Sequence, residues 1–240
     1  MKNIVIIKTG DSIPSLVAKR GDFEDWIIAG MANNHPFDVV VVPVHKGEMP
    51  PDFDMIAGIV ITGSHDSVTD RADWSEKTAN WLLKAVKREI PILGICFGHQ
   101  ILAYALGGKV GSPPGGPEFG TVPVSLTPAS MKDPVLGNLP RTVEAQTSHY
   151  QSVLNLPPEA TLLAFSEKDP HSAVRYGACV WGVQFHPEFD AGIAAAYIHE
   201  CSEIIEKFNY NSAALSDSCK DTDTGGIILR RFAKFVADGS

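Results

Sequence analysis

The sequence predicts an α/β fold, in which an open, mostly parallel sheet has helices on both faces and a small antiparallel β extension. Short apolar runs alternate with amphipathic segments over residues 1–108, as in strand–helix–strand units of a parallel sheet. The segment 91–108 (PILGICFGHQILAYALGG) joins one apolar run to a helical pattern through a glycine-containing turn. Beyond it the chain is rich in glycine and proline, and its short β segments fit antiparallel strands.

The first half is expected to contain four buried strands and three helices, one of which follows Cys96 and is stopped by Gly107-Gly108. Strands are predicted at 3–8, 37–42, 55–62 and 91–95, where β-branched and other apolar residues dominate as they do in buried parallel strands. Helices are predicted at 23–31 and 71–89, where apolar side chains recur at helical spacing. The segment 9–15 (TGDSIPS) is interpreted as a turn.

The second half is expected to complete a single domain, 1–240. Short β segments are predicted at 121–126, 141–145, 161–166 and 173–175, with one more buried strand at 179–185 and a helix at 189–208. The core then covers about 1–208. The polar range 209–226 is expected to be a flexible surface loop, and a final helix is predicted in 227–240, from 227 to 237.

Composition restricts the class of protein. Of 240 residues, 44% are hydrophobic and 20% are charged, which is ordinary for a soluble globular protein. The net charge of −8 argues against nucleic acid as a partner. No apolar run is long enough for a membrane span or a signal peptide, so we expect a cytoplasmic protein without a membrane partner. The four cysteines form no C-x-x-C pair, so neither a metal site nor another cofactor is expected.

Cys96 lies where the strand at 91–95 turns into a helix. Gly94 and Gly98 flank it, and glycines permit the sharp turn that lifts a nucleophile above a sheet. The first turn of a helix carries partial positive charge, which favours a thiolate. The N–H of Phe97 would point at the oxyanion formed when Cys96 attacks a carbonyl. The alternative is a buried structural cysteine.

A second chemical motif follows the strand at 179–185. His186 precedes Pro187, which restricts His186 to extended geometry, and Glu188 follows. A carboxylate at this spacing can hold one ring nitrogen while the other faces a thiol, as in a nucleophile–base–orienter triad. A lone histidine is more often structural, so the interpretation depends on the cysteine turn. His65, His99 and His149 also lie near the motifs, but we expect none of them to be catalytic.

The two motifs resemble a known pair. G-I-C-F-G-H-Q (94–100) followed by G-V-Q-F-H-P-E (182–188) is similar to the signatures of class I, triad-type glutamine amidotransferases, above all to stand-alone GMP-synthase-like domains. I-T-G-S (61–64) resembles the oxyanion loop of that family, E-F-G (118–120) with V-P-V (122–124) its E-x-G-x-x-x-V strand, and S-H-Y-Q-S-V (148–153) its S-H-x-D-x-V segment. The resemblance implies a flavodoxin-like fold.

The resemblance also implies roles for residues. The catalytic triad would be Cys96, His186 and Glu188, the backbone N–H groups of Gly63 and Phe97 would form the oxyanion hole, and Gln100 with the backbone at Ser148 and Tyr150 would bind substrate. Two departures concern the pocket: Gln151 stands where the family often has Asp, and the Gly63 loop lacks the usual double glycine before proline.

Three functions are compatible with these residues. The first is hydrolysis of L-glutamine to glutamate and ammonia. The chain has no S-G-G-x-D-S or G-x-x-x-x-G-K-[ST] loop that could activate an acceptor with ATP. The ammonia would therefore pass to a separate synthetase subunit or be released. The second is cleavage of small γ-glutamyl compounds by a γ-glutamyl peptidase. The third is an idle binding or regulatory protein, against which the complete triad argues. A cysteine-elbow stress protein is a weaker alternative, because nothing in it explains the H-P-E motif.

Overall fold

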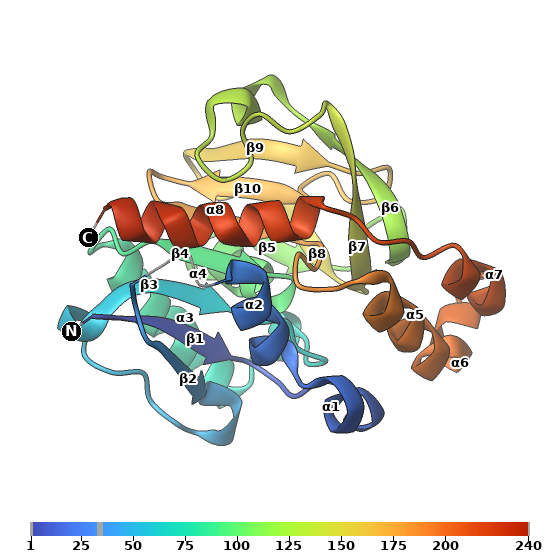
Figure 1. The fold of residues 1–240 in the computed structure, drawn as a ribbon, viewed down its shortest axis with the longest axis horizontal. Coiled ribbons are helices and arrows are strands. Elements are labelled where there is room, and N and C mark those ends of the chain that lie inside the picture. The colour runs from blue at the N-terminus through green and yellow to red at the C-terminus, as the bar shows by residue number, and fades with distance from the viewer. Residues whose placement is uncertain (1, 33–35, 240) are drawn as a thin grey trace.

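The computed structural model describes residues 2–32 and 36–239, and in this part of the chain one sheet of nine strands forms the centre of the molecule (Figure 1). The strand order is β2-β1-β3-β4-β11-β10-β9-β6-β7. The five strands from β2 to β11 are parallel neighbours: β2 (Val39–Pro43), β1 (Asn3–Lys8), β3 (Ile56–Ile61), β4 (Ile92–Ile95) and β11 (Val180–Val183). The sequence-based prediction of a mostly parallel α/β sheet is confirmed.

The antiparallel extension continues the same sheet beyond β11. Its strands are β10 (Ala173–Tyr176), β9 (Ala160–Phe165), β6 (Glu118–Leu126) and β7 (Thr142–His149). A separate antiparallel pair consists of β5 (Lys109–Gly111) and β8 (Ser152–Asn155), which the sequence analysis did not predict. Both strands are too short to carry a recognisable alternation of apolar and polar residues.

Helices cover both faces of the parallel half. Figure 1 shows α2 (Phe23–Met31) and α8 (Thr224–Asp238) side by side in front of the sheet, with α3 (Asp73–Val86) and α4 (Phe97–Ala105) behind it. Short 3-10 helices lie in the connections at Val44–Lys46, Phe53–Met55, Val68–Asp70 and Pro128–Lys132. No helix in the described residues is long and apolar enough to cross a bilayer.

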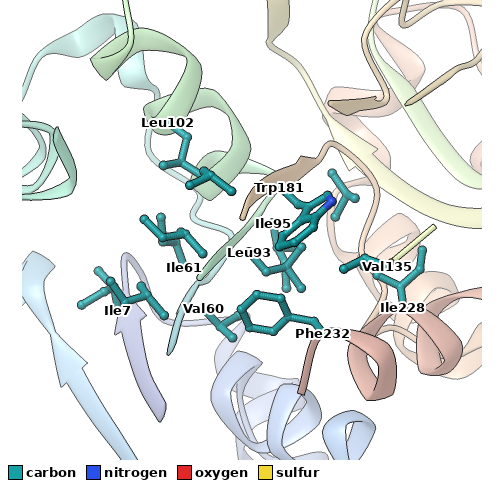
Figure 2. Packing of buried hydrophobic residues seen from close by; sticks show 14 of the residues in the cluster. Ile7, Val60, Ile61, Leu93, Ile95, Leu102, Val135, Trp181, Ile228 and Phe232 are labelled. Atoms are coloured by element: carbon teal, nitrogen blue, oxygen red, sulfur yellow. The ribbon is translucent and has the colours of Figure 1, made fainter. Parts of the chain in front are cut away.

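The core lies between these layers, around the β-branched residues of the central strands. Figure 2 shows Trp181 of β11 next to Phe232 of α8, and the two rings meet edge to face at 6.3 Å. The indole nitrogen of Trp181 donates to both carboxylate oxygens of Asp133, 3.1 Å away. On the other side of the sheet, Leu102 of α4 packs near Ile61 of β3. Helix α4 also packs closely on β11, because a Cβ at Gly182 would lie 2.1 Å from Nδ1 of His99, so β11 is fixed from both faces just before the segment that contains His186.

Two short helices occupy ranges that were predicted to lack structure. Helix α1 (Pro14–Arg20) begins inside the expected turn at 9–15, because Pro14 is favourable at the first helical position. Helix α7 (Ser212–Asp217) lies in the expected loop at 209–226, and Asn211 caps it by accepting from the N–H of Ala214 at 3.0 Å. The predicted helix at 189–208 is divided at Cys201 into α5 (Ala191–Glu200) and α6 (Ser202–Glu206).

Candidate active site

The site lies at the carboxyl ends of β4 and β11, which are parallel neighbours in the sheet. Ile95 pairs with Val183, so the residues that follow the two strands emerge side by side. The N–H of Cys96 donates to the carbonyl oxygen of Val183 at 2.8 Å, which ties the start of one turn to the other strand. This sheet register brings Cys96 and His186 together although they are ninety residues apart in sequence.

The backbone strain at this turn belongs to Cys96 itself. Cys96 has φ 50° and ψ −102°, an unusual conformation for a residue with a side chain. Gly94 and Gly98 have no positive φ; instead they allow close packing. A Cβ at Gly94 would lie 2.4 Å from the carbonyl oxygen of Gly98, and one at Gly98 would lie 2.5 Å from that of Ile61. The expectation that the glycines supply the turn is therefore corrected: they make room, and the cysteine adopts the strained conformation.

His186 is held by its neighbours on several sides. Its Nδ1 lies 2.7 Å from Oε1 of Glu188, and both side chains are buried. The ring of Phe189 stacks on the imidazole at 4.1 Å between centroids, and the ring of Phe23 lies parallel to it at 6.1 Å. With Nδ1 occupied by Glu188, Nε2 is the ring nitrogen left for the thiol of Cys96.

The charge state of His186 follows from these contacts. Burial lowers the pKa of His186, but the negative charges of Glu188 and Cys96, with hydrogen bonds to both, raise it to about 10. The imidazole is therefore protonated at neutral pH when Cys96 is a thiolate. An imidazolium beside a thiolate is the arrangement that a cysteine nucleophile requires.

The two backbone N–H groups that the resemblance assigns to an oxyanion hole belong to turns next to Cys96 and His186. Phe97 is the first residue of α4 and Gly63 follows β3; within the described residues neither N–H makes a hydrogen bond. The hydroxyls of Thr9 and Thr62 each lie 2.9 Å from the carbonyl oxygen of Gly63 and fix the orientation of this loop. A Cβ at Gly63 would lie 2.9 Å from Cε1 of His186, so this position accepts only glycine without a shift.

The predicted substrate-binding residues line the same cavity as Cys96 and His186. Gln100, Ser148 and Tyr150 all contribute to its wall. The amide nitrogen of Gln100 is engaged within the protein, because it donates to the carbonyl oxygen of Gln151 at 2.8 Å and to Oε1 of Gln184 at 3.2 Å. The carbonyl oxygen of Ser148 lies 4.0 Å from Sγ of Cys96.

The cavity also has walls that sequence reasoning missed. Phe23, His65, Tyr197 and Cys201 contribute to its lining. The imidazole of His65 stacks on the ring of Tyr197 at 5.7 Å, and the Tyr197 hydroxyl lies 2.7 Å from that of Ser12. Nothing local in the sequence marks these residues, because they come from elements far apart in the chain.

The other histidines near the motifs have structural surroundings. His99 is fully buried: its Nε2 lies 3.1 Å from the carbonyl oxygen of His171, and its Nδ1 lies 3.3 Å from the hydroxyl of Tyr176. Burial lowers the pKa of His99 to about 3, so its imidazole is neutral. His149 lies at the cavity, with Nδ1 3.1 Å from the carbonyl oxygen of Gln151 and Nε2 3.6 Å from Oε2 of Glu118.

The described residues contain no cluster of side chains that could bind a metal ion. In 2–32 and 36–239, no group of three His, Cys, Asp or Glu side chains is arranged to hold a metal ion. The polar groups that line the cavity include the thiol of Cys96, the imidazoles of His65, His149 and His186, the carboxylate of Asp66, and amide and hydroxyl groups.

Comparison with known proteins identifies the family. The model of the family "Glutamine amidotransferase class-I" matches residues 21–202. The chain belongs to this family. Among solved structures, a glutamine amidotransferase from Thermotoga maritima covers 99% of this chain with a TM-score of 0.78 at 21% identity, which shows the shared fold.

Two curated relatives of this class-I amidotransferase carry different names. It is 35% identical over 154 residues to Gamma-glutamyl peptidase 5 of Arabidopsis thaliana, covering 62% of this chain and 61% of that protein. It is also 35% identical over 153 residues to a glutamine-hydrolysing GMP synthase subunit of Ignicoccus hospitalis, covering 63% of this chain and 67% of that protein. The aligned part thus spans about two thirds or less of these relatives.

Proposed function

We propose that this class-I amidotransferase hydrolyses the side-chain amide of L-glutamine to glutamate and ammonia through a γ-glutamyl thioester on Cys96. The observation that carries the proposal is the strained Cys96 at the start of α4 beside the hydrogen-bonded pair of His186 and Glu188. This set contains a nucleophile, an acid–base group and a residue that orients it.

In the first half-reaction, the thiolate of Cys96 attacks the amide carbon of glutamine and forms a C–S bond. The carbonyl oxygen takes the negative charge, and the N–H groups of Phe97 and Gly63 are the donors available to hold it. When the tetrahedral intermediate collapses, the C–N bond breaks and the imidazolium of His186 gives its proton to the departing nitrogen. Ammonia leaves and the γ-glutamyl thioester remains.

In the second half-reaction, water hydrolyses the thioester. Neutral His186 takes a proton from the water as it attacks the same carbonyl carbon, and the C–S bond breaks. The thiolate of Cys96 and the imidazolium of His186 are restored, and glutamate leaves. Throughout the cycle Glu188 holds the imidazole through Nδ1 and stabilises its charged form.

A second candidate, cleavage of small γ-glutamyl compounds, is supported by a specific observation. The chain is 35% identical to Gamma-glutamyl peptidase 5 and also 35% identical to the GMP synthase relative. The acyl group and the thioester are the same in both reactions, and only the departing amine differs. On the side of His186, which protonates that amine, the cavity is lined by Phe23, His65 and Tyr197.

In the experiment, the purified protein is incubated separately with L-glutamine, with a γ-glutamyl dipeptide and with the α-linked isomer of that dipeptide. Glutamate and ammonia are measured by mass spectrometry and enzymatic assay. We expect glutamate and ammonia from glutamine, and nothing from the α-linked dipeptide. Cys96→Ala should be inactive, whereas Cys219→Ala, which changes a cysteine outside the cavity, should retain activity. Preferential release of the amine from the γ-linked dipeptide would favour the peptidase, and turnover by Cys96→Ala would contradict both.

A further inference from the structure

Gln184 is buried next to the sulfur of Cys96 although it belongs to neither the triad nor the oxyanion hole. It follows β11 directly and is 1% exposed. Its side-chain Nε2 lies 3.5 Å from Sγ of Cys96. The chain bends at Gln184 and Phe185, and the side chains of Gln184 and His186 both reach the thiol. Gln184 thus contacts the reacting atom directly.

The orientation of the Gln184 amide is fixed by a main-chain carbonyl. The carbonyl oxygen of Gln151 can only accept, so the group of Gln100 that faces it at 2.8 Å is the amide nitrogen. That same nitrogen lies 3.2 Å from the Gln184 side chain, which must therefore present its oxygen there. The nitrogen of Gln184 is then the atom that faces Cys96. At Gln184, therefore, the network presents a donor to the sulfur, whereas the carbonyl oxygen of Ser148 lies 4.0 Å from it.

We propose that Gln184 is a catalytic residue that donates a hydrogen bond to the thiolate of Cys96, and that Gln100 is the positioning residue that aims it. The proposal rests on the proposed role of Cys96 as the nucleophile. A neutral amide stabilises the negative sulfur without competing for the proton that His186 carries. Negative charge leaves the sulfur when the thioester forms and returns when it breaks, so the donor favours release of the acyl group in the second step.

The test measures alkylation of Cys96 by iodoacetamide from pH 5 to pH 10, followed by mass spectrometry of the peptide that contains Cys96. Only the thiolate reacts, so the rate reports the thiolate population and needs no substrate. The variants are Gln184→Met, which keeps the length of the side chain but cannot donate, and Gln184→Glu, which places an acceptor against the sulfur. Gln146→Met is the matched control, because Gln146 is equally buried and its amide bonds to Lys220 and Thr121 instead.

We expect Gln184→Met to lower the alkylation rate about tenfold to hundredfold at pH values below the wild-type midpoint, as for loss of a hydrogen bond to a charged group, and Gln184→Glu to lower it further. The midpoint of the pH profile should rise in both, while Gln146→Met keeps the wild-type midpoint. In wild-type protein labelled with ¹⁵N-glutamine, the side-chain N–H signal of Gln184 should shift over the same pH range, which tests the contact without any variant.

A wild-type midpoint in folded Gln184→Met, or a Gln184 signal that does not respond while Cys96 titrates, would overturn the inference. Absence of turnover with glutamine and γ-glutamyl compounds would count against the proposed function alone, because alkylation and the NMR titration do not depend on a substrate.

Discussion

Nδ1 of His186 lies 2.7 Å from Oε1 of Glu188, and a single residue, Pro187, separates them in the chain. Helix α8 packs on this turn, since a Cβ at Gly225 would lie 2.1 Å from the carbonyl oxygen of Pro187. The turn is therefore held by the proline, by the carboxylate and by the start of a helix. This rigidity keeps Nε2 of the imidazole on the side of Cys96.

The roles proposed for these two residues predict unequal losses. His186→Ala removes the acid–base group, which typically contributes about 100- to 10,000-fold to rate, and we expect a loss in kcat of that size. Glu188→Gln keeps an oxygen that can accept from Nδ1–H but removes the negative charge, so its loss should be smaller. Steady-state kinetics on the better of the two proposed substrates measures both. Equal losses would mean that Glu188 does more than orient and stabilise the imidazole.

The conformation of Cys96 predicts an unusual order of stability. Cys96→Ala removes the thiol and should abolish turnover while the fold remains. Cys96→Gly should be as inactive, yet more stable than Cys96→Ala by about 1 kcal/mol, because glycine adopts a φ of 50° without the strain that a Cβ brings. Urea denaturation of the two variants measures the difference. At most positions the order is reversed, so a less stable glycine variant would show that the turn stores no strain.

Local patterns predicted much of the fold and the principal residues of the site. The bounds of β1 and α2 agree with those predicted from apolar periodicity. The meeting of Cys96 with His186 was predicted from the cysteine turn and from the H-P-E motif, which suit a nucleophile and its base. Helix α7 was missed because a short helix is set by its cap at Asn211 and by packing, not by its own periodicity. The contact of Phe23 with His186 depends on how α2 docks, which no local pattern encodes.

The four cysteines should differ in reactivity toward iodoacetamide. Burial raises the pKa of Cys179, Cys201 and Cys219, so these thiols stay protonated at neutral pH. Cys96 instead faces an imidazolium and the start of a helix. We expect one equivalent of reagent at pH 7 to label Cys96 in preference to the others, and peptide mass spectrometry identifies the site. Preferential labelling of Cys201, which lines the same cavity, would contradict the proposed activation of Cys96 by His186.

Gly63 provides a test of the oxyanion loop. In Gly63→Ala the added Cβ would meet Cε1 of His186 at 2.9 Å, so the imidazole or the loop must shift. Loss of one oxyanion donor typically costs about 100- to 1,000-fold in rate, and we expect kcat to fall by at least this much. Circular dichroism should show a folded protein. Gly47→Ala is a control whose added Cβ meets nothing within 4 Å; kcat lost equally in both variants would argue that contact with His186 is not responsible.

His99 predicts a pH dependence of stability. Its pKa is about 3 in the folded protein, because burial disfavours the charged ring, against 6.5 when unfolded. Below pH 6.5 the unfolded chain binds a proton that the folded chain does not, so the free energy of unfolding falls as pH falls toward 3. Between pH 7 and pH 5 the loss from this residue is about 2 kcal/mol. Urea denaturation at both pH values measures it.

The matched variant is His99→Gln, whose amide can donate to His171 and accept from Tyr176 but does not titrate. It should be less stable than wild type at pH 7 yet lose about 2 kcal/mol less on going to pH 5. His186, whose raised pKa makes its contribution fully present below pH 6.5 and lost as pH rises toward 10, is present in both proteins, so its contribution cancels in the comparison. An unchanged slope in His99→Gln would mean that His99 binds its proton in the folded protein.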